Sequence, residues 1–220
     1  MTEDRTADEQ VDEEDFEDDE AFGPPPTVDP APISYPGIDV RTEAAGPLPV
    51  TASKLGGVPY LAPGASAPAD DDGAPLAFLA QIRCEDLPAN GFLPESGLLQ
   101  FWIGADDLWG LDLEDPLGST CAVLHVEDPD PAVTAEDVAT RLRLPDDADS
   151  PLETDADGLA LHFTPAPEHT VWEAGVQLLQ LDSNDPGVMW GDMGVGHVFV
   201  TKEQALARDY SAPLYHWDCG

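Results

Sequence analysis

Five side chains near the C-terminal end have the chemistry of metal ligands. They are Asp182, Asp192, His197, His216 and Asp218. Carboxylates suit Mg²⁺ or Ca²⁺, whereas imidazole suits Zn²⁺. His216 and Asp218 are two positions apart, so on an extended chain they would share a face. No pair shows the H-E-x-x-H or C-x₂-C spacing of a zinc site. These five residues are weak candidates for a metal site, which would make the protein a metal-assisted enzyme.

Three glutamines occupy similar places in strand-like segments. Gln81, Gln100 and Gln180 each follow apolar residues, in "FLAQI", "LLQF" and "LLQL". A buried glutamine must satisfy about four hydrogen-bonding positions, and each one left unpaired costs about 1–3 kcal/mol. We favour the interpretation that they brace irregular backbone; lining a polar cleft is the alternative.

Tryptophans beside acidic residues extend that alternative. Trp109 lies in "DDLWGLD", and Trp190 and Trp217 lie close to acids in "MWGD" and "HWD". An aromatic ring beside a carboxylate is a common lining for recognising cations. Buried tryptophans with bonded N–H groups are the interpretation we favour. The candidate binding cleft comprises Gln81, Gln100, Asp107, Trp109, Gln180, Asp182, Trp190, Asp192 and Trp217.

The stretch "VMWGDMGVGHVFV" carries Gly191, Gly194 and Gly196 between two apolar runs. A dinucleotide fingerprint needs G-x-G-x-x-G opening a helix, and a P-loop needs a lysine; neither is present. The preceding "SNDPG" is typical of a turn. We therefore expect a hairpin of 176–182 with 188–200, in which the glycines allow a bulge or a close backbone approach. Asp192 would bond stray backbone N–H groups.

Nucleophilic catalysis has no support in the sequence. Cys84, Cys121 and Cys219 lack a family signature, and there is no G-x-S-x-G elbow. His125 and His162 lie in apolar strands, where structural histidines are more common than ligands. We assign no catalytic residue and no cofactor.

Strand patterns outnumber helix patterns. Alternation predicts Phe78, Ala80 and Ile82 on one face of "PLAFLAQIR", and separates Leu99, Phe101 and Ile103 from Leu98, Gln100 and Trp102 in "GLLQFWIG". "STCAVLHVED", "GLALHFTP" and "GVQLLQLDS" are further strands. Several are apolar on both faces, which indicates a sheet covered on both sides. Helix signals begin at Thr134, with Pro145 as the stop, and at Thr201, which has capping-box spacing to Gln204. The fold class predicted is α+β, with a mixed or antiparallel sheet and few short helices.

The charge is strongly negative along the whole chain. The 220 residues have a net charge of −37, and residues 1–22 hold twelve acids and one base. We predict a disordered acidic, proline-rich tail over 1–47 and a single domain over 48–220. Such a charge repels nucleic acid and anionic membrane surfaces and favours a basic protein or peptide as partner.

The sequence also suggests a compartment. Three cysteines do not form a secreted disulfide framework. The first residues are acidic where a signal peptide needs bases, and no apolar run approaches the ~18 residues of a membrane span. We expect a soluble cytoplasmic protein; its oligomeric state is not indicated.

Several motifs together resemble the YwqG-like family of bacterial proteins. They are "SKLGGVPYL", "PLAFLAQI", "LPESGLLQFWIGADDLWGLD", "LLQLDSND", "MWGDMGVGHVFV" and "LYHWDC", in order from about residue 53 to 220. The resemblance implies a compact α+β domain without an established activity or catalytic residues. The family's association with toxin–immunity loci implies binding. The segment "SPLETDADGLALHFTPAPEHTVWEAG" departs from the family's usual Gly-His-rich pattern there. The function predicted is a non-catalytic protein- or peptide-binding module, with an immunity-type role as one form of it.

Overall fold

Two antiparallel sheets account for most of the regular structure. The computed structural model describes residues 33–115, 120–144, 148–154, 157–171 and 175–219. A six-stranded sheet has the order β1-β6-β2-β3-β4-β5, and a three-stranded sheet has the order β7-β8-β9. The strands are β1 (Ile33–Glu43), β2 (Lys54–Leu55), β3 (Ala77–Arg83), β4 (Leu98–Ile103), β5 (Cys121–Val126), β6 (Leu159–Val171), β7 (Gly175–Asp182), β8 (Val195–Thr201) and β9 (Leu214–Asp218). The helices are the 3-10 turn η1 (Cys84–Asp86), α1 (Ala135–Ala139) and α2 (Lys202–Ala207). The α+β prediction is confirmed.

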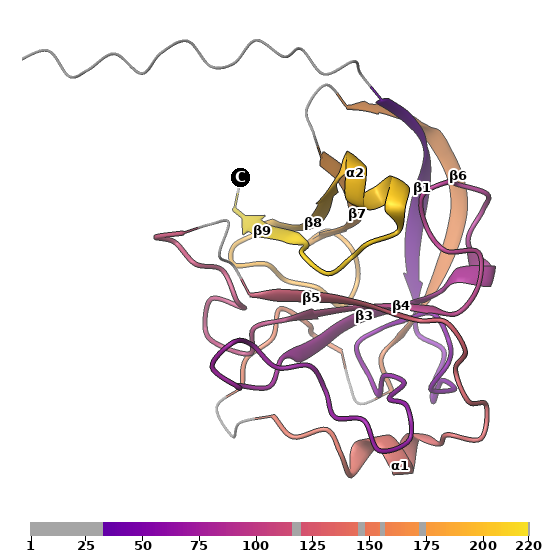
Figure 1. The fold of residues 1–220 in the computed structure, drawn as a ribbon. Coiled ribbons are helices and arrows are strands. Elements are labelled where there is room, and N and C mark those ends of the chain that lie inside the picture. Colours follow the sequence, from indigo (N-terminus) through magenta and orange to yellow (C-terminus); the bar gives the residue numbers. More distant parts are fainter. Residues whose placement is uncertain (1–32, 116–119, 145–147, 155–156, 172–174, 220) are drawn as a thin grey trace, which may run out of the picture.

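The six-stranded sheet is covered on both faces, as its apolar strands predict. One face packs against the three-stranded sheet and α2 through a core that includes Leu99, Phe101, Leu181 and Val200. The other face packs against α1 and the loops through a smaller cluster that includes Tyr60 and Trp102. Figure 1 shows the resulting order, with β7–β9 and α2 above β3–β5 and α1 below.

The predicted faces of β4 are confirmed, but the prediction for β3 is wrong at Phe78 and at Leu79, which was expected on the face opposite Ala80 and lies in the main core with it. The β3–β4 register shifts between Phe78 and Ala80. This irregularity puts Phe78 opposite Trp102, in the smaller cluster, while Ala80 and Ile82 lie in the main core. The alternation therefore breaks at Leu79, because one extra residue on one strand reverses the side chains beyond it.

The boundary predicted for the tail is also wrong. Residues 33–43 form β1, which pairs with β6 over nearly its whole length. Pro36 lies at a register shift, and β1 is the outermost strand of the sheet, where a proline removes no bond needed by a second neighbour. Figure 1 shows β1 and β6 as a curved ribbon rising beside the three-stranded sheet. The rest of the predicted tail that precedes β1, residues 1–32, lies outside the described residues.

Both helix starts are confirmed. The Thr134 hydroxyl accepts from the Asp137 N–H, and the Thr201 hydroxyl accepts from the Gln204 N–H, each within a reciprocal capping box. The α1 helix is shorter than its pattern suggests and ends at Ala139; beyond it the Arg141 guanidinium donates to the carbonyls of Leu61, Ala62 and Ala65. The predicted stop at Pro145 lies outside the described residues. Neither helix has the length or apolar character needed to cross a membrane, and the same holds for every described helix.

Candidate functional site

The structure separates the nine predicted cleft residues into different surroundings. Gln81 and Gln100 are buried, with 0% and 1% of their surface exposed. The Gln81 amide donates to the carbonyls of Val50 and Ala52, both at 2.8 Å, and its oxygen accepts from the Tyr60 N–H at 3.0 Å. The Gln100 amide donates to that same oxygen at 2.9 Å and to the Tyr60 carbonyl at 2.7 Å. These two glutamines brace backbone, as we favoured, and line no cleft.

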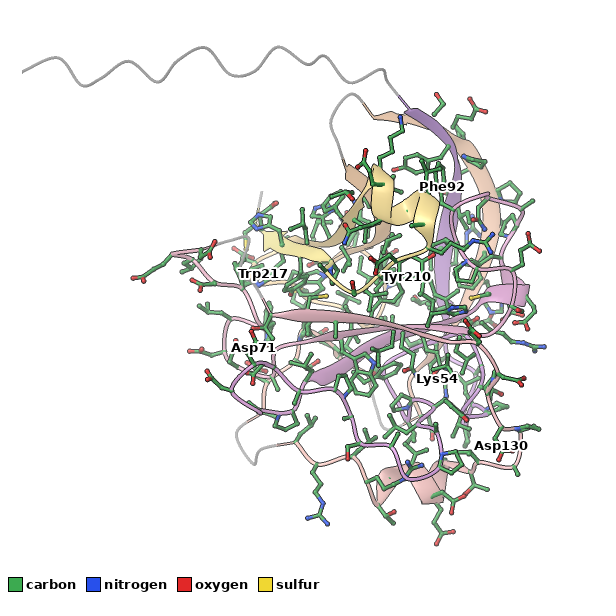
Figure 2. The ribbon with its side chains drawn as sticks, viewed as in Figure 1. Lys54, Asp71, Phe92, Asp130, Tyr210 and Trp217 are labelled. Atoms are coloured by element: carbon green, nitrogen blue, oxygen red, sulfur yellow. The ribbon has the colours of Figure 1, made fainter. Side chains whose placement is uncertain are left out.

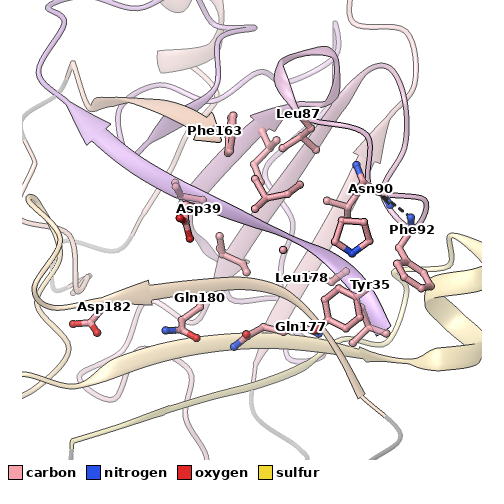
Figure 3. Close-up of a pocket in the computed structure, with 18 of the residues that line it drawn as sticks. Tyr35, Asp39, Leu87, Asn90, Phe92, Phe163, Gln177, Leu178, Gln180 and Asp182 are labelled. Carbon is pink, nitrogen blue, oxygen red and sulfur yellow. Dashed lines mark hydrogen bonds between the residues drawn. The ribbon is translucent and has the colours of Figure 1, made fainter. Parts of the chain in front are cut away.

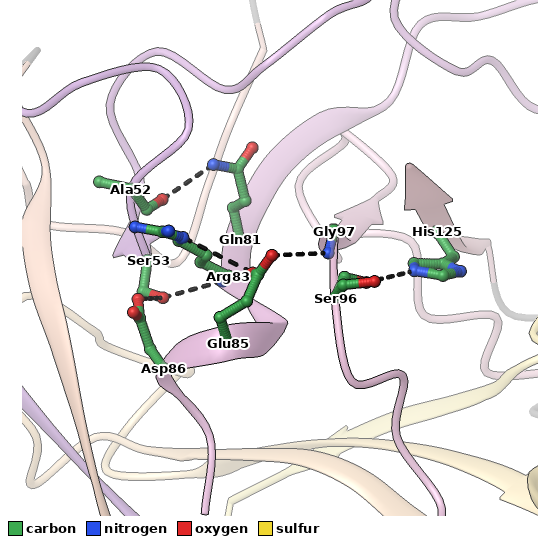
Figure 4. A network of polar contacts seen from close by, with 9 residues as sticks. All are labelled: Ala52, Ser53, Gln81, Arg83, Glu85, Asp86, Ser96, Gly97 and His125. Atoms are coloured by element: carbon green, nitrogen blue, oxygen red, sulfur yellow. Dashed lines mark hydrogen bonds and ion pairs between the residues drawn. The ribbon is translucent and has the colours of Figure 1, made fainter. Parts of the chain in front are cut away.

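Lys54 belongs to the same region. We give the name braced interior to the side chains of Gln81, Gln100 and Lys54, which bond backbone groups within residues 49–60. The Lys54 ammonium donates to the carbonyls of Pro49 (2.6 Å) and Val58 (2.9 Å). Burial lowers the pKa of Lys54 from 10.5 to about 8, since an ammonium loses hydration there. Figure 2 places Lys54 below the central sheet, and Figure 4 shows Gln81 next to the Ser53–Asp86 and Arg83–Glu85 contacts at the end of β3.

Trp109, Trp190 and Trp217 form one aromatic cluster. Their ring centroids lie 4.8 Å apart for Trp109–Trp217, 5.7 Å for Trp109–Trp190 and 6.2 Å for Trp190–Trp217. Trp217 donates to the Leu108 carbonyl at 2.8 Å. The indole N–H groups of Trp102, Trp109 and Trp190 are buried without a partner among the described residues, so our expectation of bonded N–H groups is wrong for these three. Trp172 lies outside the described residues.

The glycines near this cluster provide close approach, as predicted. A Cβ at Gly196 would collide with the Trp190 ring, and one at Gly194 would collide with the Asp218 carbonyl. Strands β7 and β8 pair as the expected hairpin. Asp192 does not have the role we expected: among the described residues its carboxylate makes no hydrogen bond, and its own N–H approaches the Cys219 Sγ at 3.4 Å.

Four of the five predicted metal ligands share the outer face of the three-stranded sheet. His197 lies opposite His216, and Val195 lies between Asp182 and Asp218 in the register. Burial lowers the pKa of His197, and the neighbouring charge of His216 adds to the effect while Asp218 and Asp182 oppose it. Asp192 lies in the turn before β8, away from this face. Within the described ranges, no group of three His, Cys, Asp or Glu side chains is placed to hold a metal ion.

His125 and His162 have structural contacts. The His125 ring nitrogen Nε2 lies 2.9 Å from the Ser96 carbonyl, and His162 lies 3.3 Å from Glu43 on the neighbouring strand. Cys84 is buried, and burial raises its pKa to about 11, which opposes formation of the nucleophilic thiolate.

A pocket lies between β1 and β7, the outermost strands of the two sheets (Figure 3). We call it the β1–β7 pocket; its volume is about 310 Å³. At one end the Gln177 N–H points to the Tyr35 hydroxyl at 3.4 Å, and at the other the Thr42 hydroxyl donates to the Pro186 carbonyl at 3.2 Å. Strands β1 and β7 therefore run in the same direction along the two sides of the pocket. These two hydrogen bonds connect the segments at its ends, and the pocket separates them in between. The lining residues are Tyr35, Pro36, Gly37, Ile38, Asp39, Val40, Ile82, Leu87, Asn90, Phe92, Leu93, Phe163, Val176, Gln177, Leu178, Leu179, Gln180, Asp182 and Asp185.

The two edges that face the pocket are free of strand partners in the described part of the chain. Strand β1 pairs with β6 and strand β7 pairs with β8, and each sheet ends there. A free strand edge exposes backbone N–H and C=O groups that another chain can bond. The pocket thus combines apolar side chains, polar side chains and free strand edges on both sides, and proteins hold extended segments by strand-like bonds and side-chain pockets of this kind.

Sequence reasoning found part of this pocket. Gln180 and Asp182 belong to the predicted cleft and do line it, whereas Asp107, Trp109, Trp190, Asp192 and Trp217 do not. It missed Tyr35 and Val40, because we assigned their segment to the tail. The signal available was the apolar spacing in "ISYPGIDV", which the proline and the glycine obscured.

Comparison with protein families gives one match. The model of a family described as "Domain of unknown function (DUF1963)" matches residues 53–174 and 150–219, which together span both sheets except β1. A comparison with curated proteins finds no match to this chain.

Proposed function

The chain belongs to the DUF1963 family of domains of unknown function, and we propose that it is a non-catalytic, YwqG-like module that binds a segment of a partner protein or peptide in the β1–β7 pocket. The observation that carries the proposal is a cavity of about 310 Å³ that is lined by both apolar and polar groups and flanked by two free strand edges. An immunity-type role, which the YwqG-like resemblance implies, would use the same pocket to hold its partner.

The interior of the pocket suits an apolar anchor. Val40, Leu178 and Phe163 lie among its lining residues, and such side chains gain about 25 cal/mol for each Å² of apolar surface they cover. The free backbone of β7 would fix the direction of the bound segment by strand-like bonds. The metal-assisted alternative finds no comparable support among the described residues.

A pocket-filling substitution tests this function. The purified chain would be used to select from random heptapeptides displayed on phage, and the enriched peptides would then be synthesised and titrated. Val40→Trp fills the pocket from β1, and we expect it to weaken peptide binding by at least about tenfold, which is 1.4 kcal/mol. The control is Val126→Trp, a half-buried valine on the opposite edge strand of the same sheet, which should leave binding within about twofold.

Thermal unfolding of both variants checks that each remains folded. Failure to enrich any peptide, or enriched peptides that bind Val40→Trp as tightly as the unmodified chain, would refute the proposed function.

A further inference from the structure

The β1–β7 pocket has the walls of a site for a long, flexible side chain. Tyr35 and Phe92 form an edge-to-face pair with ring centroids 5.6 Å apart, and both line the pocket with Phe163. Figure 3 shows Tyr35 near Leu178 and Gln177 in one part of the pocket and Phe163 in another, across the β1 ribbon. Aromatic and aliphatic surfaces of this kind cover the methylene stem of a lysine or arginine while its charged end reaches a polar rim.

The rim carries negative charge without a compensating cation. Asp39 lies on β1, and Asp182 and Asp185 lie at the end of β7 and in the turn after it. Among the described residues, no lysine, arginine or histidine lines the pocket. Burial raises the pKa of the Asp185 carboxyl; a hydrogen bond from the Asp182 backbone opposes the rise, and the negative charge of Asp182 adds to it. Each carboxylate here would gain from a bound cation.

The polar groups around the rim are not equally available. The Asp182 carboxylate already accepts from the Asn184 backbone and side chain, at 2.8 and 2.7 Å, and the Asn90 oxygen accepts from two backbone N–H groups. The side chain of Gln180 is exposed and makes no hydrogen bond with the described residues. Gln180 and the Asp39 carboxylate are therefore acceptors that a donor entering the pocket would find. The Asp185 carboxylate already takes a hydrogen bond from the Asp182 backbone, and its remaining acceptor positions are open to the same donor.

We propose that the β1–β7 pocket takes the side chain of one lysine or arginine from the partner segment. The stem packs against Tyr35 and Leu178, and the charged end bonds Asp39, Asp185 and Gln180. The proposal rests on the proposed function and names the chemistry of its partner. The charge of the rim disfavours an anionic occupant, including the chain's own residues 1–22 with their twelve acids.

Two matched probes test the charge requirement. N-acetyl-arginine methylamide and N-acetyl-citrulline methylamide have nearly the same shape, but the citrulline side chain is neutral. We expect the arginine probe to shift the amide resonances of β7 saturably in the millimolar range, and the citrulline probe to bind at least about tenfold more weakly. Asp39→Asn and Asp185→Asn should each weaken arginine binding several-fold. Asp192→Asn changes an exposed aspartate outside the pocket and should leave it unchanged.

The outcomes separate this inference from the proposed function. Selected heptapeptides that depend on Val40 but contain no basic residue, or that tolerate Asp185→Asn, would overturn the cation preference and leave the peptide-binding function. Saturable arginine binding without any peptide binding would overturn the function and leave the preference. Equal binding of the two probes, or no saturable shift with either, would overturn the inference, and the dispersion of the amide spectra shows that each variant is folded.

Discussion

The braced interior and the β1–β7 pocket both present amide side chains from strands, but they use them in opposite ways. Gln81 and Gln100 make five hydrogen bonds with each other and with backbone. Gln180, on the edge strand β7, makes none with the described residues. A glutamine in an apolar strand therefore indicates a binding site only where its amide has no hydrogen-bond partner within the fold. Edge strands are the places where such partners are missing.

The largest effect should come from removing an amide of the braced interior. Gln81→Leu would leave the carbonyls of Val50 and Ala52 and the N–H of Tyr60 buried without partners. Each orphaned group costs about 1–3 kcal/mol, so we expect the free energy of unfolding in urea to fall by about 4 kcal/mol. The matched control, Gln180→Leu, removes an exposed amide and should change it by less than about 0.5 kcal/mol. Similar losses at the two positions would erase the contrast between the regions.

Lys54 provides a pH-dependent view of the braced interior. Its pKa is about 8 in the folded chain and 10.5 as an unperturbed lysine. Between these values the unfolded chain holds the proton and the folded chain has released it, so stability rises with pH across the window. The stability of the unmodified chain relative to Lys54→Met should therefore increase by about 3 kcal/mol from the lower to the upper value.

Urea unfolding of both chains at several pH values measures this difference. Cys84, whose pKa burial raises to about 11, titrates in both chains and cancels in the comparison. A difference that stays constant with pH would mean that the Lys54 ammonium keeps its hydration, and that the interior is open to water.

The same contrast explains how much could be predicted from the sequence. Strand β4 alternates without interruption, so its faces could be assigned from local pattern, and the bracing role of Gln81 and Gln100 followed from the cost of burying an amide. The β1–β7 pocket could not be derived in this way. It depends on β1 pairing with β6, more than 100 positions later in the chain, and on two sheet edges meeting. Strand β1 itself carries a proline, which is tolerated there because β1 is an edge strand and the proline lies at a register shift.

The smallest and most specific effect on stability should come from substituting Asp185. This substitution tests whether the charge that Asp185 holds in the pocket destabilises the fold. The folded pKa of Asp185 lies above the ordinary 3.8, so the folded chain holds a proton that the unfolded chain releases, and stability falls as pH rises through that window. At neutral pH this penalty is fully present. Asp185→Asn removes it, and we expect a gain of less than about 1 kcal/mol, since solvent screens a half-exposed carboxylate. The gain should vanish in urea titrations below pH 3.8.

Asp209→Asn is the control, because bonds from the side chain and backbone of Ser211 lower the pKa of that carboxyl and its removal should bring no gain. A loss of stability with Asp185→Asn at neutral pH would show that the hydrogen bond from the Asp182 backbone outweighs the cost of burying the charge, as the bonds of the braced interior do for its glutamines. The pocket would then be a second closed network, with no charge left over for a partner to neutralise.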